Sequence, residues 1–203
     1  MALSVDYYFA PNSPWTYLGH ERFAQIARAT GATVHVLPVD LGGKVFPVSG
    51  GLPLSKRAPQ RQAYRLVELK RFSEVLGQPI VLQPKFFPVN ADDAARLIIA
   101  VDMHDGSDAA MRLAGRILRG VWIDERNIAD ARDLAKMLDE EGLPARRLDD
   151  SMSQAVHERY ERDTQRAIDA GVFGAPSYVI EGELFWGQDR LDFVERRLIG
   201  AGA

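Results

Sequence analysis

Residues 3–41, LSVDYYFAPNSPWTYLGHERFAQIARATGATVHVLPVDL, decide the fold. Residues 3–9 are rich in β-prone side chains, and the turn-forming sequence PNSP follows them closely. Apolar side chains then recur at helical spacing over residues 15–30, and Gly31 marks the end of that predicted helix. Residues 33–41 are typical of a second strand, although a proline weakens the pattern. This order predicts a β-α-β unit, and the crossover helix implies parallel strands.

The rest of the chain predicts a helical middle and a second β-rich end. Residues 42–59 combine glycine, proline, serine and lysine without periodicity, which indicates a long loop of the kind that often carries function. Two β-prone stretches around Gly182 predict a hairpin, and residues 190–198 predict a closing amphipathic helix. Helical spacing of apolar residues predicts further helices over residues 60–76, 91–103, 108–122, 129–141 and 152–170. The predicted order is β-α-β, a helical block, and β-β-α.

The composition excludes several classes of protein. The 203 residues carry a formal net charge of −3 and are 46% hydrophobic, which is enough apolar material for an ordinary core. The charge balance and the lack of a long basic run argue against a nucleic-acid partner. No apolar run approaches the roughly 20 residues of a membrane helix, and the first residues lack the pattern of a secretory signal. We therefore expect a soluble, cytoplasmic protein without a membrane partner.

The absence of cysteine narrows the possible chemistry further. Without a cysteine the chain has no disulfides, no thiolate metal ligands and no catalytic thiol of its own. The four histidines are scattered without metal-ligand spacing, so we expect no metal site. Glycine motifs that cradle nucleotide phosphates and the Gly-x-Ser-x-Gly elbow of hydrolases are also missing. Any chemistry must therefore come from other residues or from an external cofactor.

Ser13 lies where the first predicted strand ends and the first predicted helix begins. Backbone N–H groups and the positive end of the helix dipole favour an anion at such a position, and a thiolate or a carboxylate would fit. The alternative is that the Ser13 side chain only caps the helix. The local pattern leaves both interpretations open.

Two later segments also join regular elements. In residues 171–177, GVFGAPS, Pro176 comes at the start of a predicted strand. It is either a device that protects a sheet edge or a cis-proline that exposes the preceding backbone to a ligand. Residues 185–190, FWGQDR, run from a strand end into a helix and are typical of an N-cap with an aromatic anchor.

Together with residues 13–18, SPWTYL, these segments resemble the 2-hydroxychromene-2-carboxylate isomerase family. That family is related to kappa-class glutathione transferases and to disulfide oxidoreductases of the DsbA type. The likeness extends over residues 3–198, and the three motifs occur in the family's order. The resemblance implies an α/β, thioredoxin-like fold with a large all-helical insertion. It assigns residues 1–58 and 172–203 to the thioredoxin-like domain and residues 59–171 to the inserted helical domain.

The resemblance also implies a glutathione site. Related oxidoreductases have Cys-x-x-Cys at the start of the first helix, whereas this chain has SPWT there and cannot cycle a dithiol. Ser13 matches the family's catalytic serine, which keeps the glutathione sulfur as thiolate, and a helix N-terminus lowers a thiol pKa. Ala175 and Pro176 match the cis-proline loop, where the residue before proline pairs with the cysteinyl part of glutathione. The segment that holds the γ-glutamyl end is matched by Trp186, Gly187, Gln188 and Asp189.

Residues for the second substrate are matched in the same way. Lys44, Ser55, Lys56 and Phe87 correspond to the family's substrate-binding positions. The lysines can receive a carboxylate, although exposed lysines are also ordinary solvated charges. Phe87 can cover a ring substrate or simply pack under a loop. Residues 50–51 are Gly-Gly where related sequences often have Gly-Asn, so one side-chain amide is missing from the predicted substrate site.

The resemblance predicts a glutathione-dependent cis-trans isomerase that converts 2-hydroxychromene-2-carboxylate, a small aromatic carboxylate, to trans-o-hydroxybenzylidenepyruvate. Such enzymes act in the breakdown of aromatics such as naphthalene. Thiolate addition to an unsaturated carbon would permit rotation about a single bond before elimination. A kappa-like glutathione transferase or peroxidase is one alternative, and a non-catalytic thioredoxin-fold binding protein is another. The family also implies a homodimer.

Overall fold

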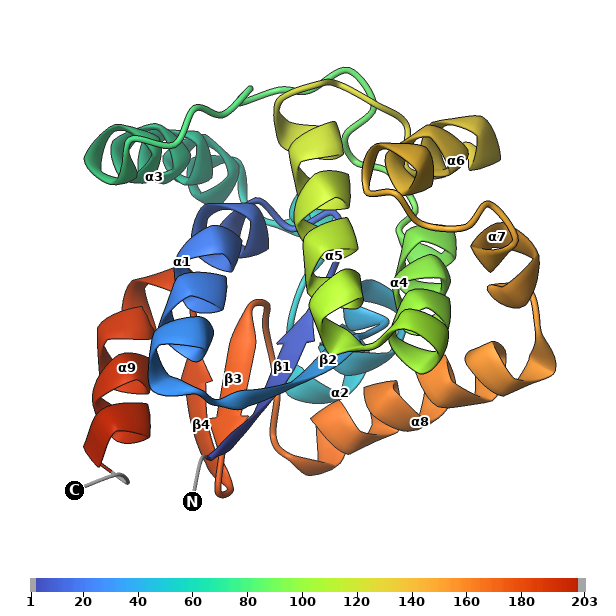
Figure 1. The fold of residues 1–203 in the computed structure, drawn as a ribbon. Helices are drawn as coiled ribbons and strands as arrows, with labels where there is room; N and C mark the ends of the chain where they lie inside the picture. Colours follow the sequence, from blue (N-terminus) through green and yellow to red (C-terminus); the bar gives the residue numbers. More distant parts are fainter. Residues whose placement is uncertain (1–2, 201–203) are drawn as a thin grey trace.

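The computed structural model describes residues 3–200, so the first two and last three residues of the predicted thioredoxin-like domain lie outside it. A four-stranded sheet with strand order β2-β1-β3-β4 forms the centre (Figure 1). Strand β1 (Ser4–Phe9) runs parallel to β2 (Thr33–Pro38), and helix α1 (Pro14–Thr30) connects them. The predicted β-α-β unit is confirmed.

The C-terminal part adds two antiparallel strands to the same sheet. Strand β3 (Ser177–Ile180) pairs with β1 on one side and with β4 (Glu183–Trp186) on the other. Gly182 has φ +84° in the tight turn between them, so the predicted hairpin is confirmed. A 3-10 turn, η3 (Gln188–Arg190), leads into helix α9 (Leu191–Gly200), which packs against α1.

The helical middle is also as predicted, with one short helix in addition. Its members are α3 (Pro59–Leu76), α4 (Asp92–Asp105), α5 (Ser107–Trp122), α6 (Ala131–Glu140), α7 (Arg147–Asp150) and α8 (Gln154–Asp169). The sequence did not predict α7, because a single helical turn is too short for apolar periodicity to show. No helix within residues 3–200 is long and apolar enough to cross a membrane.

The segment predicted as a long loop contains short helical turns. They are a π-helical turn η1 (Leu41–Val45), a single turn of α-helix α2 (Phe46–Ser49) and a 3-10 turn η2 (Leu54–Lys56). The Asp40 side chain accepts a hydrogen bond from the Gly43 N–H at 2.7 Å and thereby starts the first of these turns. Strand β2 consequently ends at Pro38, three residues earlier than the predicted Leu41.

Helices α3 and α5 differ in how deeply they enter the core. The α5 helix buries one whole face, including the fully buried Trp122, against α1, α4 and α6. On the sheet side Tyr7 is fully buried, and its ring lies 5.4 Å from that of Tyr178. The α3 helix, in contrast, buries only Leu69 and packs against α1 at the side of the molecule (Figure 1). Most of the α3 side chains are therefore not needed for the core.

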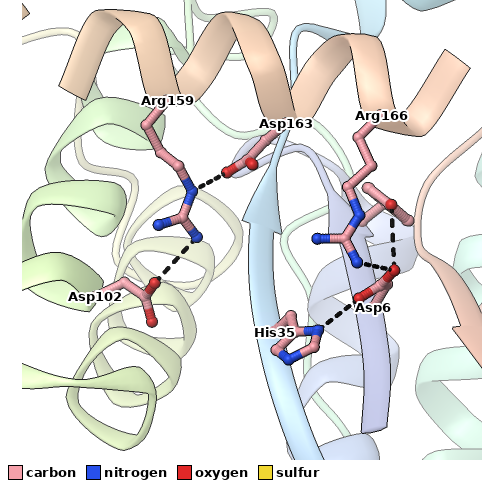
Figure 2. Close-up of polar contacts among 7 residues, drawn as sticks. Asp6, His35, Asp102, Arg159, Asp163 and Arg166 are labelled. Carbon is pink, nitrogen blue, oxygen red and sulfur yellow. Dashed lines mark hydrogen bonds and ion pairs between the residues drawn. The ribbon is translucent and has the colours of Figure 1, made fainter. Parts of the chain in front are cut away.

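Helix α8 is fastened to its neighbours by ion pairs. Arg159 donates from Nε to Asp163 Oδ2 at 2.6 Å and from Nη2 to Asp102 Oδ2, on α4, at 3.2 Å (Figure 2). The side chains of Asp163 and Asp102 are 8% and 11% exposed, so both carboxylates depend on this partner.

A second contact of α8 reaches the sheet. Arg166 pairs with Asp6 on β1 (Figure 2). The same carboxylate lies 2.6 Å from His35 Nδ1 on β2. The Tyr8 hydroxyl also donates to Asp6, at 3.5 Å. Asp6 thus links both parallel strands to the helix that covers them.

Candidate active site

The first part of the site is the turn between β1 and α1. Ser13 is only 8% exposed and is the N-cap of α1, because its Oγ accepts a hydrogen bond from the Thr16 N–H at 3.2 Å. Pro14 occupies the first helical position, where a missing N–H costs nothing. A hydroxyl has one donor and two acceptor sites, so Ser13 can cap the helix and still donate its O–H to an anion. The two interpretations of Ser13 are therefore compatible.

The second part is the loop before β3. The Ala175–Pro176 peptide bond is cis, as predicted. The Pro176 carbonyl accepts a hydrogen bond from the Gly187 N–H at 2.9 Å, which ties the loop to the end of β4. Within residues 3–200, the N–H and C=O of Ala175 have no hydrogen-bond partner, although this residue is only 9% exposed. Ala175 lines the cavity described below, so these free backbone groups suit pairing with a peptide-like ligand.

Trp186 forms the third part, at the end of β4. Its indole lies so close to Gly174 that a Cβ there would come within 2.3 Å of Nε1. Its ring centroid is also 4.8 Å from that of Phe173. Trp186 is nevertheless 51% exposed, so it forms a rim that a ligand can contact. Glycine at position 174 is needed to bring the cis-proline loop against this rim.

The residues that follow Trp186 are held from behind by α1. Gln188 is 3% exposed and packs so closely on Gly19 that a Cβ at Gly19 would lie 2.7 Å from the Gln188 Cβ. The Gln188 side-chain nitrogen is buried without a hydrogen-bond partner. Asp189 is exposed, and its carboxylate pairs with the neighbouring Arg190 at 2.7 Å. Gly187 has φ +106°, a conformation that favours glycine.

These parts border one open cavity of about 890 Å³. Of the residues predicted for the site, Ser13, Ala175, Trp186 and Phe87 line it together, although they come from four different segments. The predicted residues that do not line this cavity are Pro176, Gly187, Gln188, Asp189, Lys44, Ser55 and Lys56. The cavity therefore brings together three of the seven residues predicted for glutathione and one of the four predicted for the second substrate.

Apart from Phe87, the residues predicted for the second substrate lie outside the cavity. Lys44, in η1, forms an ion pair with Glu161 on α8. Ser55 and Lys56 are exposed on η2. Their roles in substrate binding stay predictions.

The cavity contains a group of residues that the sequence interpretation missed. Three arginines line it, Arg57 just before α3 and Arg61 and Arg65 in the first turns of α3. We call them the arginine wall, and none of them forms an ion pair with a carboxylate of residues 3–200. The spacing of four residues places the side chains of Arg61 and Arg65 on one face of α3, so this part of the pattern was visible in the sequence. The Arg57 Nε donates only to the Leu52 carbonyl, at 2.8 Å.

Arg65 is the most enclosed of these arginines. Its guanidinium carbon lies 5.1 Å from the ring centroid of Phe87 and 5.7 Å from that of Trp122, so the group is held against aromatic rings. Its Nη2 atom is buried and has no hydrogen-bond partner. Burial, together with the charge of Arg57, lowers the pKa of Arg65 to about 10, so the side chain remains a cation at neutral pH.

The acidic residues at the cavity are already engaged elsewhere. Asp40 accepts from the Gly43 N–H, and Asp92 accepts from the Tyr160 hydroxyl at 3.0 Å. The Asn12 Nδ2 atom donates to the Val89 carbonyl at 2.8 Å and fixes the segment that carries Phe87. Within residues 3–200 no three histidine, aspartate or glutamate side chains are arranged to hold a metal ion. These donors are neutral, so the cavity carries the two carboxylates of Asp40 and Asp92 as well as the three guanidinium groups of the arginine wall.

The fold defines a thioredoxin-fold protein in which Ser13, and no cysteine, lies at the N-terminus of α1. A family model described as "DSBA-like thioredoxin domain" matches residues 4–199, and the chain belongs to this family. It is similar to a 2-hydroxychromene-2-carboxylate isomerase of Sphingobium xenophagum, with 27% identity, 98% of this chain and all of the relative covered. A solved structure of a 2-hydroxychromene-2-carboxylate isomerase has a TM-score of 0.80 and 27% identity, with 97% of this chain and 94% of that one covered.

A more distant relative belongs to the transferases. Glutathione S-transferase kappa 1 of Caenorhabditis elegans is 23% identical, and the match covers 94% of this chain and 88% of the relative. The resemblance to the isomerase family that the sequence motifs indicated is confirmed, and so is the DsbA-like thioredoxin fold.

Proposed function

We propose that the protein is a glutathione-dependent cis-trans isomerase of the 2-hydroxychromene-2-carboxylate type, acting in aromatic degradation. The observation that carries this proposal is the position of Ser13, at the start of α1, on a cavity that also contains the unpaired Ala175 backbone and a wall of arginines. The names of the similar proteins support the reaction type, and the kappa-class relative supports glutathione.

The residues present fit glutathione, a tripeptide with two carboxylates. The free N–H and C=O of Ala175 suit the pairing that a cysteinyl peptide unit offers. The Trp186 ring can cover the peptide, and the unpartnered Gln188 amide and the exposed Asp189 carboxylate are the groups proposed for the γ-glutamyl end. Pro176 and Gly187 would keep these groups in place through their mutual hydrogen bond.

Bound glutathione supplies a thiolate that can add to an unsaturated carbon and leave again. The Ser13 hydroxyl would donate a hydrogen bond to this anion while its lone pair accepts from the Thr16 N–H. The N-terminal end of the α1 dipole favours the same negative charge. Phe87 would lie beside the ring of the second substrate, with Lys44, Ser55 and Lys56 proposed as further contacts on the loop outside the cavity.

Ser13→Ala tests the role of the hydroxyl. Turnover should fall, most at low pH, because the thiol pKa of bound glutathione rises when a hydrogen bond to the thiolate is lost. The measurement is an ultraviolet titration of the thiolate in the complex, together with the pH profile of turnover. The cap is lost as well, at a cost of about 0.5–2 kcal/mol of stability.

Ser153→Ala is the matched control for that loss of a cap. Ser153 caps α8 by accepting from the Val156 N–H at 3.4 Å and does not line the cavity. The Ser153→Ala variant should have a lower melting temperature and an unchanged thiol pKa of bound glutathione. If Ser13→Ala behaves in the same way, Ser13 only caps the helix and its catalytic assignment is wrong.

Turnover of 2-hydroxychromene-2-carboxylate with and without glutathione separates the candidate functions. The proposal requires turnover that depends on glutathione. A kappa-like transferase or peroxidase, which the C. elegans relative favours, would instead consume glutathione with an electrophile or a peroxide. A non-catalytic binding protein would bind glutathione and show neither activity.

Three further expectations from the family resemblance belong to this proposal. They are assembly into a homodimer, location in the cytoplasm, and the division into a thioredoxin-like domain and an inserted helical domain at residues 59–171. Sedimentation as a 22.6 kDa monomer at working concentration would contradict the first. Cell fractionation and limited proteolysis test the other two.

A further inference from the structure

The arginine wall has no role in the proposed chemistry of Ser13. Ser13, Ala175 and Trp186 line the cavity together with Arg57, which precedes α3, and with Arg61 and the aromatic-backed Arg65 of α3. Cationic side chains that are partly buried without an anionic partner are unfavourable, because they lose hydration without compensation. Arg65 is such a group, whereas Arg61 is exposed, and an anion that binds from solution would compensate the charge of Arg65.

Arg65 has features that select the type of anion. The guanidinium is held against Phe87 and Trp122, and its Nη2 atom is buried without a partner. A guanidinium stacked on a ring keeps its in-plane N–H groups for hydrogen bonds, and a carboxylate matches that planar geometry with two parallel bonds. The neighbouring Phe87 ring adds an apolar surface for a flat molecule.

We propose that Arg65 is the residue that binds the carboxylate of the second substrate, and that it selects planar unsaturated carboxylates over uncharged analogues. The proposal deepens the proposed function and rests on it only for the reaction that follows binding. Arg57 and Arg61 strengthen the field at the open end of the wall, where they are less enclosed than Arg65. The positively charged loop residues Lys44 and Lys56 are not required for this contact.

The carboxylate bound by Arg65 can come from the second substrate or from glutathione, because glutathione itself has two carboxylates. Arg65 lies against Phe87 and Trp122, and neither ring belongs to the turn at Ser13, the cis-proline loop or the end of β4. This placement favours the second substrate. Separate binding measurements with each ligand distinguish the two sources.

The test uses the full-length protein, trans-cinnamate as a planar carboxylate, and cinnamamide as its uncharged analogue. Calorimetry at saturating glutathione should show that the protein prefers cinnamate to cinnamamide. Arg65→Leu should weaken cinnamate binding by about 10- to 100-fold, the usual value of a hydrogen bond to a charged group, and leave cinnamamide unchanged. Arg65→Lys, which keeps the charge without the planar fork, should lose part of the affinity.

Lys70→Gln is the matched control, because Lys70 is an exposed residue of α3 that does not line the cavity. It removes one positive charge and should leave both ligands unaffected. Equal cinnamate affinity in Arg65→Leu and the parent protein would overturn the proposal. A loss of glutathione affinity in Arg65→Leu with unchanged cinnamate binding would also overturn it, since Arg65 would then hold glutathione. Failure of chromene turnover leaves these binding results intact and would count only against the proposed function.

Discussion

Two groups of arginines in this molecule have different surroundings. On α8, Arg159 and Arg166 lie against aspartates that come from α4, from β1 and from α8 itself (Figure 2). Arg57, just before α3, and Arg61 and Arg65 on α3 line a cavity and have no carboxylate partner within residues 3–200. The first group compensates buried charge inside the protein, and the second group leaves a positive charge for a ligand.

The residue type alone does not reveal whether an arginine stabilises the fold or is available to a ligand. Arg61 and Arg65 lie four residues apart on α3, and Arg159 and Arg166 lie seven residues apart on α8, so each pair shares one helical face. What separates them is the charge of the element opposite. Aspartates face α8, whereas the rings of Phe87 and Trp122 face Arg65. Substitutions in the two regions should therefore change different properties of the protein.

The largest effect is expected for Arg159→Leu. This change removes the cationic partner of two nearly buried carboxylates, Asp163 and Asp102, and should lower the free energy of unfolding by about 3–5 kcal/mol. Glutathione affinity should not change. Urea unfolding measures the loss, and Arg162→Leu on the exposed side of the same helix should cost less than about 1 kcal/mol.

The loss of unfolding free energy in Arg159→Leu should depend on pH. Burial raises the pKa of Asp163, and Arg159 partly opposes that rise, so the substitution raises the pKa further. A carboxyl whose pKa is raised on folding stabilises the fold most below its ordinary value of about 4, and this contribution is lost as the pH increases through the raised pKa. The deficit should therefore be larger at neutral pH than near pH 4. A deficit independent of pH would show that Asp163 is not its source.

Arg65→Leu should have a much smaller effect on stability. The substitution removes an unpaired, partly buried charge and also a contact between a cation and two rings, and these changes act in opposite directions. The free energy of unfolding without ligand should stay within about 1 kcal/mol of the parent value. Cinnamate should raise the melting temperature of the parent protein only. A loss as large as that of Arg159→Leu would mean that Arg65 has a structural role like the arginines of α8.

The smallest effect is expected for Lys44→Met. Lys44 forms an ion pair with Glu161 in which both side chains are about half exposed, at 44% and 58%, and such pairs contribute less than about 1 kcal/mol. Because this pair already engages the ammonium group, cinnamate affinity should change by less than about twofold. A tenfold loss would place Lys44 in the carboxylate site and would break the distinction between paired and unpaired cations.

The local patterns of the sequence predicted most of the fold. The β-α-β unit, the hairpin and the helices of the middle each depend on spacing within one element, and this spacing was readable. The turns within residues 41–56 were not, because they depend on single hydrogen bonds such as that from the Gly43 N–H to Asp40. The cis bond before Pro176 followed from family resemblance, since the residues alone allowed either isomer.

The candidate site was predicted less completely, for a physical reason. Ser13, Ala175 and Trp186 belong to motifs that remain contiguous in the sequence, so they could be recognised. The role of Arg65 depends on its contacts with Phe87 and Trp122, which are 22 and 57 residues away in the chain. The same limitation applies to Lys44, whose partner Glu161 lies on α8.

Helix α3 buries only Leu69, and this has a consequence for how the protein can diversify during evolution. Most residues of a core helix cannot change without repacking their neighbours, but the cavity face of α3 carries few such constraints. Mutations there can change the lining of the cavity while the residues around Ser13 stay the same. Related proteins with this fold can therefore acquire new substrates through the sequence of a single helix.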